Sequence, residues 1–102
     1  MTQQDNMQVW LDADSGDGLA RLVPYVRCAR DMAMHFSMEV LQRSGGSQSR
    51  MNQRGRVHAA AGRAVALAHV ALGMPPGSAC EVKVSFSQSG RELGVYRFDC
   101  SN

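Results

Sequence analysis

The fold is decided by a stretch of alternating residues near the middle of the chain: Met32-Ala33-Met34-His35-Phe36-Ser37-Met38-Glu39-Val40. Every second side chain in it is large and apolar, and the residues between are small, polar or charged. A period of two is typical of a β-strand that buries one face and exposes the other. We therefore predict a strand over residues 32–40, with its methionines, Phe36 and Val40 in the core.

The C-terminal part of the chain repeats this pattern twice. Val82, Val84 and Phe86 alternate with polar residues, and after the turn signal Ser89-Gly90 a second apolar run extends over residues 93–98. Two alternating runs separated by such a turn predict a β-hairpin.

The N-terminal part also reads as a hairpin. Met7, Val9 and Leu11 alternate, residues 14–18 form a turn rich in Asp and Gly, and residues 19–28 form the second strand. Pro24 predicts an edge position or a bulge in that strand, because proline cannot donate a hydrogen bond to a sheet.

Residues 57–72 leave two possibilities open. The segment is rich in alanine, which has the highest helix propensity, so an amphipathic helix competes with a strand over residues 65–72. The following Gly73-Met74-Pro75-Pro76-Gly77 ends either element.

Short strands separated by Gly, Ser, Asp and Pro turns predict an all-β protein, a two-sheet sandwich. A chain of 102 residues is expected to form one domain, residues 1–102, with residues 1–6 as a flexible N-terminal tail. Membrane insertion is not expected, because Arg63 and His69 interrupt the apolar run. Residues 1–6 show neither the basic flank nor the apolar centre of a signal peptide.

The three cysteines can be placed by register. If residues 80–88 and 92–100 pair across a three-residue turn, then Val82 faces Phe98 and Cys80 faces Cys100. A two-residue Ser89-Gly90 turn would instead place Arg97 opposite Val82. Directly opposed residues can bring two sulfur atoms within bonding distance, so we expect a Cys80–Cys100 disulfide and a free Cys28. Three reduced core thiols are the alternative.

Residues 43–56 form a basic, amide-rich stretch. No acidic residue lies between Glu39 and Glu81, so the arginines of this interval lack a local neutralising partner. Either an anionic ligand binds them, or acidic residues from elsewhere, Asp12, Asp14 and Asp17, fold over them. A net charge of +2 is too small to indicate a nucleic-acid-binding protein.

Signatures of catalysis or metal binding are weak. Residues 12–18 are similar to a calcium loop, but the third acid and the glycine are displaced and Val23 stands at the closing position. The three histidines, His35, His58 and His69, have no ligand at metal-binding spacing. No Cys-x-x-Cys motif and no catalytic triad stands out. We expect neither enzymatic activity, nor a metal, nor a cofactor.

The order of several segments resembles the curli-system periplasmic chaperone family, the CsgC/CsgH-type inhibitors of curli amyloid nucleation. The resembling segments are Leu22-Val23-Pro24-Tyr25-Val26, residues 43–57 with their Gln48, Ser49 and Gln53, residues 65–72, and the terminal hairpin. The resemblance implies an immunoglobulin-like sandwich of seven strands, with residues 65–72 as one strand. It also implies a periplasmic location.

One departure from the family's better-known branch concerns redox chemistry. That branch has a Cys-x-Cys pair where this chain has Met32-Ala33-Met34. A redox role for that pair is therefore not expected here, and the chain is more similar to the CsgH-type branch. In that branch Cys80 and Cys100 would be structural.

The function implied is inhibition of amyloid nucleation by transient, electrostatically guided binding of an acidic, Gln/Asn-rich curli subunit to a monomeric chaperone. The alternatives are an adaptor or accessory protein of a curli or fimbrial secretion complex, and a small redox or ligand-binding enzyme. We expect residues 43–57 to be exposed, with Met51 and Val57 turned inward. The residues expected to bind the client are Arg43, Gln48, Arg50, Asn52, Gln53, Arg54, Arg56 and Arg63.

Overall fold

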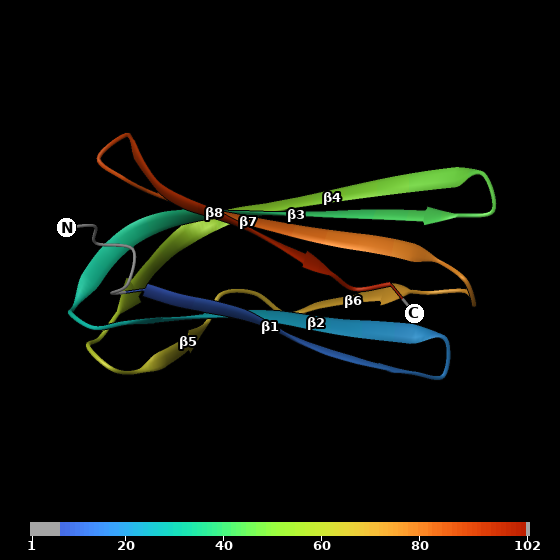
Figure 1. Cartoon of the computed structure of the whole chain (residues 1–102), viewed down its shortest axis with the longest axis horizontal. Coiled ribbons are helices and arrows are strands. Elements are labelled where there is room, and N and C mark those ends of the chain that lie inside the picture. Colours follow the sequence, from blue (N-terminus) through green and yellow to red (C-terminus); the bar gives the residue numbers. More distant parts are fainter. Residues whose placement is uncertain (1–6, 102) are drawn as a thin grey trace.

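The computed structural model describes residues 7–101, which form two antiparallel sheets packed face to face (Figure 1). Within this range there is no helix, and so none that could span a membrane. The molecule is elongated, with extents of 44 × 24 × 24 Å. The strands are β1 (Met7–Gly16), β2 (Leu19–Cys28), β3 (Met32–Ser44), β4 (Ser47–Ala59), β5 (Ala64–Ala66), β6 (Val70–Gly73), β7 (Ala79–Gln88) and β8 (Arg91–Asp99).

The two sheets are the layers of a sandwich. In one sheet β2 pairs with β1 on one side and with β5 and β6 on the other, and the second sheet has the order β4-β3-β7-β8. Figure 1 shows the first sheet as the lower layer and the second as the upper layer. The all-β sandwich predicted from the sequence is confirmed. The expected flexible tail, residues 1–6, lies outside the described residues.

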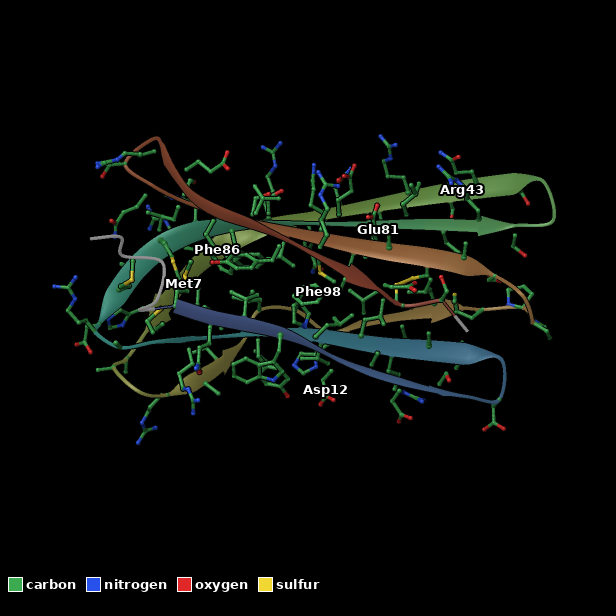
Figure 2. The ribbon with its side chains drawn as sticks, in the orientation of Figure 1. Met7, Asp12, Arg43, Glu81, Phe86 and Phe98 are labelled. Atoms are coloured by element: carbon green, nitrogen blue, oxygen red, sulfur yellow. A yellow bond between two sulfur atoms is a disulfide. The ribbon has the colours of Figure 1, made fainter. Side chains whose placement is uncertain are left out.

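The core lies between the layers and follows the predicted alternation. Met34, Phe36, Met38 and Val40 of β3 are buried, and the residues between them are more exposed. From the facing sheet, β2 contributes Leu22, Val26 and Cys28 in the same way. In Figure 2, Phe86 and Phe98 point into the space between the layers.

Pro24 is neither at an edge nor in a bulge, so this prediction was wrong. It is buried in the central strand β2, opposite Leu11 of β1. Its carbonyl oxygen accepts a hydrogen bond of 2.8 Å from the Leu67 amide, in the gap between β5 and β6. Because proline has no N–H to donate toward that side, the neighbouring strand is interrupted there. The expected single strand over residues 65–72 is thus divided in two, and the sandwich has eight strands in the described range instead of seven.

Three hairpins end in two-residue turns whose residues all have positive φ. These turns are Asp17-Gly18, Gly45-Gly46 and Ser89-Gly90. Positive φ at both positions is the type I′ geometry, which matches the twist of the paired strands. The first turn is shorter than predicted, because residues 14–16 still pair within the β1–β2 hairpin.

The β7–β8 hairpin combines the predicted register with a turn shorter than the predicted one. Val82 faces Phe98 and Val84 faces Tyr96, as expected. The turn nevertheless has two residues, because a bulge shifts the register between Phe86 and Ser87, and Leu93 is the extra residue on β8. The prediction that a two-residue turn would place Arg97 opposite Val82 was therefore wrong.

The disulfide prediction is confirmed. Cys80 and Cys100 are bonded, with their Cα atoms 4.8 Å apart, and the Cys100 amide donates a hydrogen bond to the Cys80 carbonyl. Cys28 is free and fully buried. The bond closes the open end of the β7–β8 hairpin.

Candidate functional site

The outer face of the β4-β3-β7-β8 sheet collects most of the basic residues singled out in the sequence. The inward residues of β3 have even numbers, so the odd-numbered residues face solvent, and the register places the even-numbered residues of β4 beside them. In Figure 2, Arg43 and Glu81 project from this sheet away from the other layer. We call this outer surface the basic face; its cations are Arg43, Arg50, Arg54, Arg56, Lys83 and Arg97.

Six of the eight residues expected to bind a client lie together on this face. They are Arg43, Gln48, Arg50, Asn52, Arg54 and Arg56. Gln53 does not join them, because it is paired with the buried Met38 and so belongs to the opposite side of the strand. Arg63 lies in the connection from β4 to β5, where its amide donates to the Ala60 carbonyl. That connection leads to the other sheet.

Met51 was expected to turn inward; the register places it on the inner side of β4, but it is not buried there. It is 39% exposed, although it faces the buried Val40 across β3 and β4. The β4 strand is at the edge of its sheet, and most of its length has no facing strand to cover its inner side. Val57 is half-buried and packs against the core, as expected.

Sequence reasoning missed the contribution of the second hairpin. Lys83 and Arg97 face each other across β7 and β8, next to Glu39 on β3. The predicted pairing of Val82 with Phe98 already implied this neighbour pair. His35 and His58 also lie on this face, beside Arg56. Their alternation with core residues was visible in the sequence.

A carboxylate neutralises part of the basic face. Glu39 lies between Arg50 and Lys83, with N–O distances of 3.5 and 3.6 Å. The expectation that the arginines lack a local partner is therefore corrected for Arg50. The aspartates considered as more distant partners do not provide one: Asp12 lies in the other sheet, where Figure 2 shows it pointing away from the basic face.

Arg54 and Arg56 remain without a partner in the described range. Neither forms an ion pair or a side-chain hydrogen bond with any residue from 7 to 101. Both are exposed, so their guanidinium donors are available to a ligand. Because a guanidinium binds a carboxylate through two parallel hydrogen bonds, this pair forms the part of the face best suited to an anion.

Two open grooves lie beside these arginines, the first lined by both and the second by Arg56. The first has a volume of about 620 Å³ and is lined on its outer side by Arg54, Arg56, His35 and Glu92, together with the hydroxyl groups of Ser37, Ser85 and Ser87. The second, of about 550 Å³, lies toward the β7–β8 turn. The residues lining the second groove are Ala33, Met34, His35, Arg56, Val57, His58, Gln88 and Ser89.

The β4 strand is also a long edge. It spans 13 residues and, among the strands of the described residues, pairs only with β3. Such an edge offers unpaired backbone groups to an additional strand, and charged side chains on it oppose self-association. At Gly55, between the two free arginines, an added Cβ would lie 3.0 Å from the Phe36 ring. Glycine therefore allows the ring and this part of the edge to approach closely.

The described residues offer little for covalent or metal chemistry. No group of three or more His, Cys, Asp or Glu side chains in the described range could hold a metal ion. Burial raises the pKa of the Cys28 thiol, which keeps it protonated near neutral pH. The pKa of Asp99 is lowered by hydrogen bonds from the side chain and backbone of Ser101. That carboxylate is therefore charged near neutral pH, opposite Glu81, at the far end of β8.

Two solved structures share this fold. The solution structure of R. palustris CsgH is 20% identical, with 91% of each chain covered and a TM-score of 0.74. The E. coli curli protein CsgC is 16% identical, with 90% of this chain and 97% of that one covered and a TM-score of 0.76. No protein-family model matches the chain, and curated proteins give no significant match. The resemblance to the curli system is thus confirmed at the level of the fold.

Proposed function

We propose that this protein is a curli-associated periplasmic chaperone that delays amyloid nucleation by transient binding of an acidic subunit, without catalysis. The observation that supports the proposal is the pair of unpartnered arginines, Arg54 and Arg56, on a long edge strand. Similarity of fold to a curli protein directs the proposal toward this class of client. The disulfide supports an oxidising compartment such as the periplasm.

The proposed mechanism has two steps. The basic face attracts an acidic chain over a distance comparable to the Debye length, which raises the rate of encounter. The captured segment then pairs with β4 as an added strand, using the Gln and Asn side chains of the edge as well as its backbone. Nucleation depends on rare oligomers that join through strand edges, so a weak and transient cap acts at low molar ratios.

The test is the lag time of a curli subunit's fibrillation with substoichiometric amounts of the protein. The parent lengthens the lag, and Arg54→Glu/Arg56→Glu removes most of that effect. Exposed charge changes alter stability by less than about 0.5 kcal/mol, so the fold is retained. Arg21→Glu/Arg30→Glu changes the net charge equally, away from the basic face, and serves as the matched control.

Salt provides a second measurement. The added lag falls as ionic strength rises, since the Debye length decreases from about 10 Å at 0.1 M to about 3 Å at 1 M. Each value is compared with the client alone at the same salt. Equal inhibition by the parent and Arg54→Glu/Arg56→Glu would refute the electrostatic mechanism. A permanent adaptor would bind its acidic partner without lengthening the lag at all.

A further inference from the structure

His35 and Arg56 stand at the junction of the two grooves. They face each other across β3 and β4, and both line each groove. His58 lies two residues beyond Arg56 on the same face of β4 and lines the second groove. We propose that the two grooves form one carboxylate-binding site whose affinity is set by the protonation of His35 and His58. This inference rests on the proposed function only for the identity of the natural client.

The surroundings of the two histidines favour a cationic site. His35 faces Arg56 on β4 and Ser87 on β7, and Glu92 of β8 lies opposite Ser87. His58 faces Ala33. The residues in the range 7–101 that line the second groove include no carboxylate, so an anion there meets Arg56 and the two imidazoles without an acidic competitor from this range.

In the first groove Glu92 is the carboxylate among the lining residues, against Arg54 and Arg56. The hydroxyl groups of Ser37, Ser85 and Ser87 supply neutral donors there. The amide of Gln88 is already engaged, since its nitrogen donates to the Ala33 carbonyl at 2.9 Å. Among the described residues that line the two grooves, two arginines thus stand against one carboxylate.

The ligand expected from this chemistry is an extended segment with aspartate or glutamate side chains. Both grooves lie beside the edge strand β4, and a strand added there presents every second side chain to the same face. Arginine forks then hold the carboxylates, and the serine hydroxyls complete their hydrogen bonds.

Protonation of the histidines adds charge to this site. Histidine changes charge between about pH 5 and 8, whereas a free glutamate stays ionised above about pH 5.5. A change from pH 7.8 to 5.8 crosses the range in which histidine side chains gain charge and leaves a glutamate-containing ligand anionic. Because exposed ion pairs are weak, the gain in affinity expected from the two histidines is modest, about fivefold.

The test uses a synthetic peptide of alternating Glu and Ser, with a Gln/Ser peptide as the uncharged control. Binding is titrated at both pH values by NMR, which locates the contact and follows each histidine ring. The parent is expected to bind the Glu peptide about fivefold more tightly at pH 5.8, with shifts at His35, Ser87 and His58. The double variant His35→Gln/His58→Gln loses this pH dependence, whereas His69→Gln, exposed in the connection between β5 and β6, retains it.

Arg56→Gln weakens binding at both pH values, which separates the arginine's role from that of the histidines. An affinity that does not change with pH in the parent, or that changes equally in the double histidine variant, overturns the inference. So does a single-stranded oligonucleotide that binds the same residues more tightly than the Glu peptide. If the peptide binds as expected but the fibrillation lag is unchanged, the proposed function fails and the carboxylate-binding site stands. If the lag lengthens but the peptide does not bind, the carboxylate-binding site fails and the proposed function stands.

Discussion

The β1–β2 and β3–β4 hairpins are built alike, but their outward arginines differ in the partners that their side chains have. Both have two-residue turns with positive φ. On β2, Arg27 donates to the Gln8 side-chain oxygen at 3.0 and 2.7 Å and lies 6.0 Å from the centre of the Trp10 ring, which stacks on Tyr25. On β4, Arg54 has no such partner in residues 7–101.

The difference teaches that a cluster of arginines in the sequence does not by itself show which of them are free to bind a ligand. Arg27 is exposed, yet two of its donors bind Gln8 and its guanidinium contacts the Trp10 ring, all within its own hairpin. Arg54 and Arg56 face serines and a histidine on the neighbouring strands, which leaves their donors for a ligand. Substitutions can test this contrast, and the largest effect is expected at the disulfide.

Removing the disulfide should weaken the sheet that supports the basic face. Cys80 and Cys100 are separated by 20 residues, and the chain-entropy model gives about 3 kcal/mol for a loop of this size. Cys80→Ala/Cys100→Ala is therefore expected to lower the unfolding free energy by about that amount in urea denaturation. If stability is unchanged, the loop-closure account is wrong for this hairpin.

A side chain at position 55 should disturb the β3–β4 hairpin, whereas one at position 16 should not disturb β1–β2. In Gly55→Ala the new Cβ meets the Phe36 ring at 3.0 Å, so we expect a loss of about 1–2 kcal/mol. Gly16 has no atom within 4 Å of such a Cβ and does not have a positive φ. Gly16→Ala is the control, measured by the same denaturation. Equal effects would mean that the approach of Phe36 to β4 does not limit this position.

Substitution of Arg27 should change the unfolding free energy, whereas substitution of Arg54 should change the inhibition of fibrillation. Arg27→Gln removes a ring contact and two hydrogen bonds, so it should cost about 0.5–1 kcal/mol and leave the fibrillation lag unchanged. Arg54→Gln should leave the unfolding free energy unchanged and shorten the lag. The contrast between the hairpins would be lost if Arg27→Gln reduced inhibition as much as Arg54→Gln.

The smallest effect concerns the carboxylate within the basic face. Glu39→Gln releases Arg50 and Lys83 from their ion pairs and should strengthen binding of an acidic peptide about twofold, since exposed pairs are weak. Stability should change by less than about 0.5 kcal/mol. Peptide titration of the variant and the parent measures the effect; weaker binding in the variant would show that Glu39 positions its neighbours instead of neutralising them.

Features set by alternation could be predicted from the sequence, whereas features set by neighbouring strands could not. The buried faces of β3 and β7 and the cysteine pairing could be read from a period of two. The exposure of Met51 could not, because the pattern does not show that β4 is an edge strand whose inner side is uncovered.

The position of Pro24 needed similar information. Whether a proline belongs at an edge depends on the adjacent strand, and here that strand is broken opposite it. For the candidate site, the arginines of β4 were visible as a cluster. Lys83 and Arg97 are far from them in the chain and join them only through the sheet order.

The bulge at Leu93 has a consequence for how the length of this hairpin can vary. Because of this extra residue, the register next to the Ser89-Gly90 turn differs by one residue from the register of the rest of β7 and β8. Deleting the single residue Leu93 would leave a regular ladder with the same turn and the same opposed cysteines. A one-residue deletion at this place removes the core contact of Leu93 but preserves which of the remaining side chains face the core, whereas a deletion elsewhere in β8 would invert part of the strand. Among related chains, single-residue gaps in the hairpin should accumulate here.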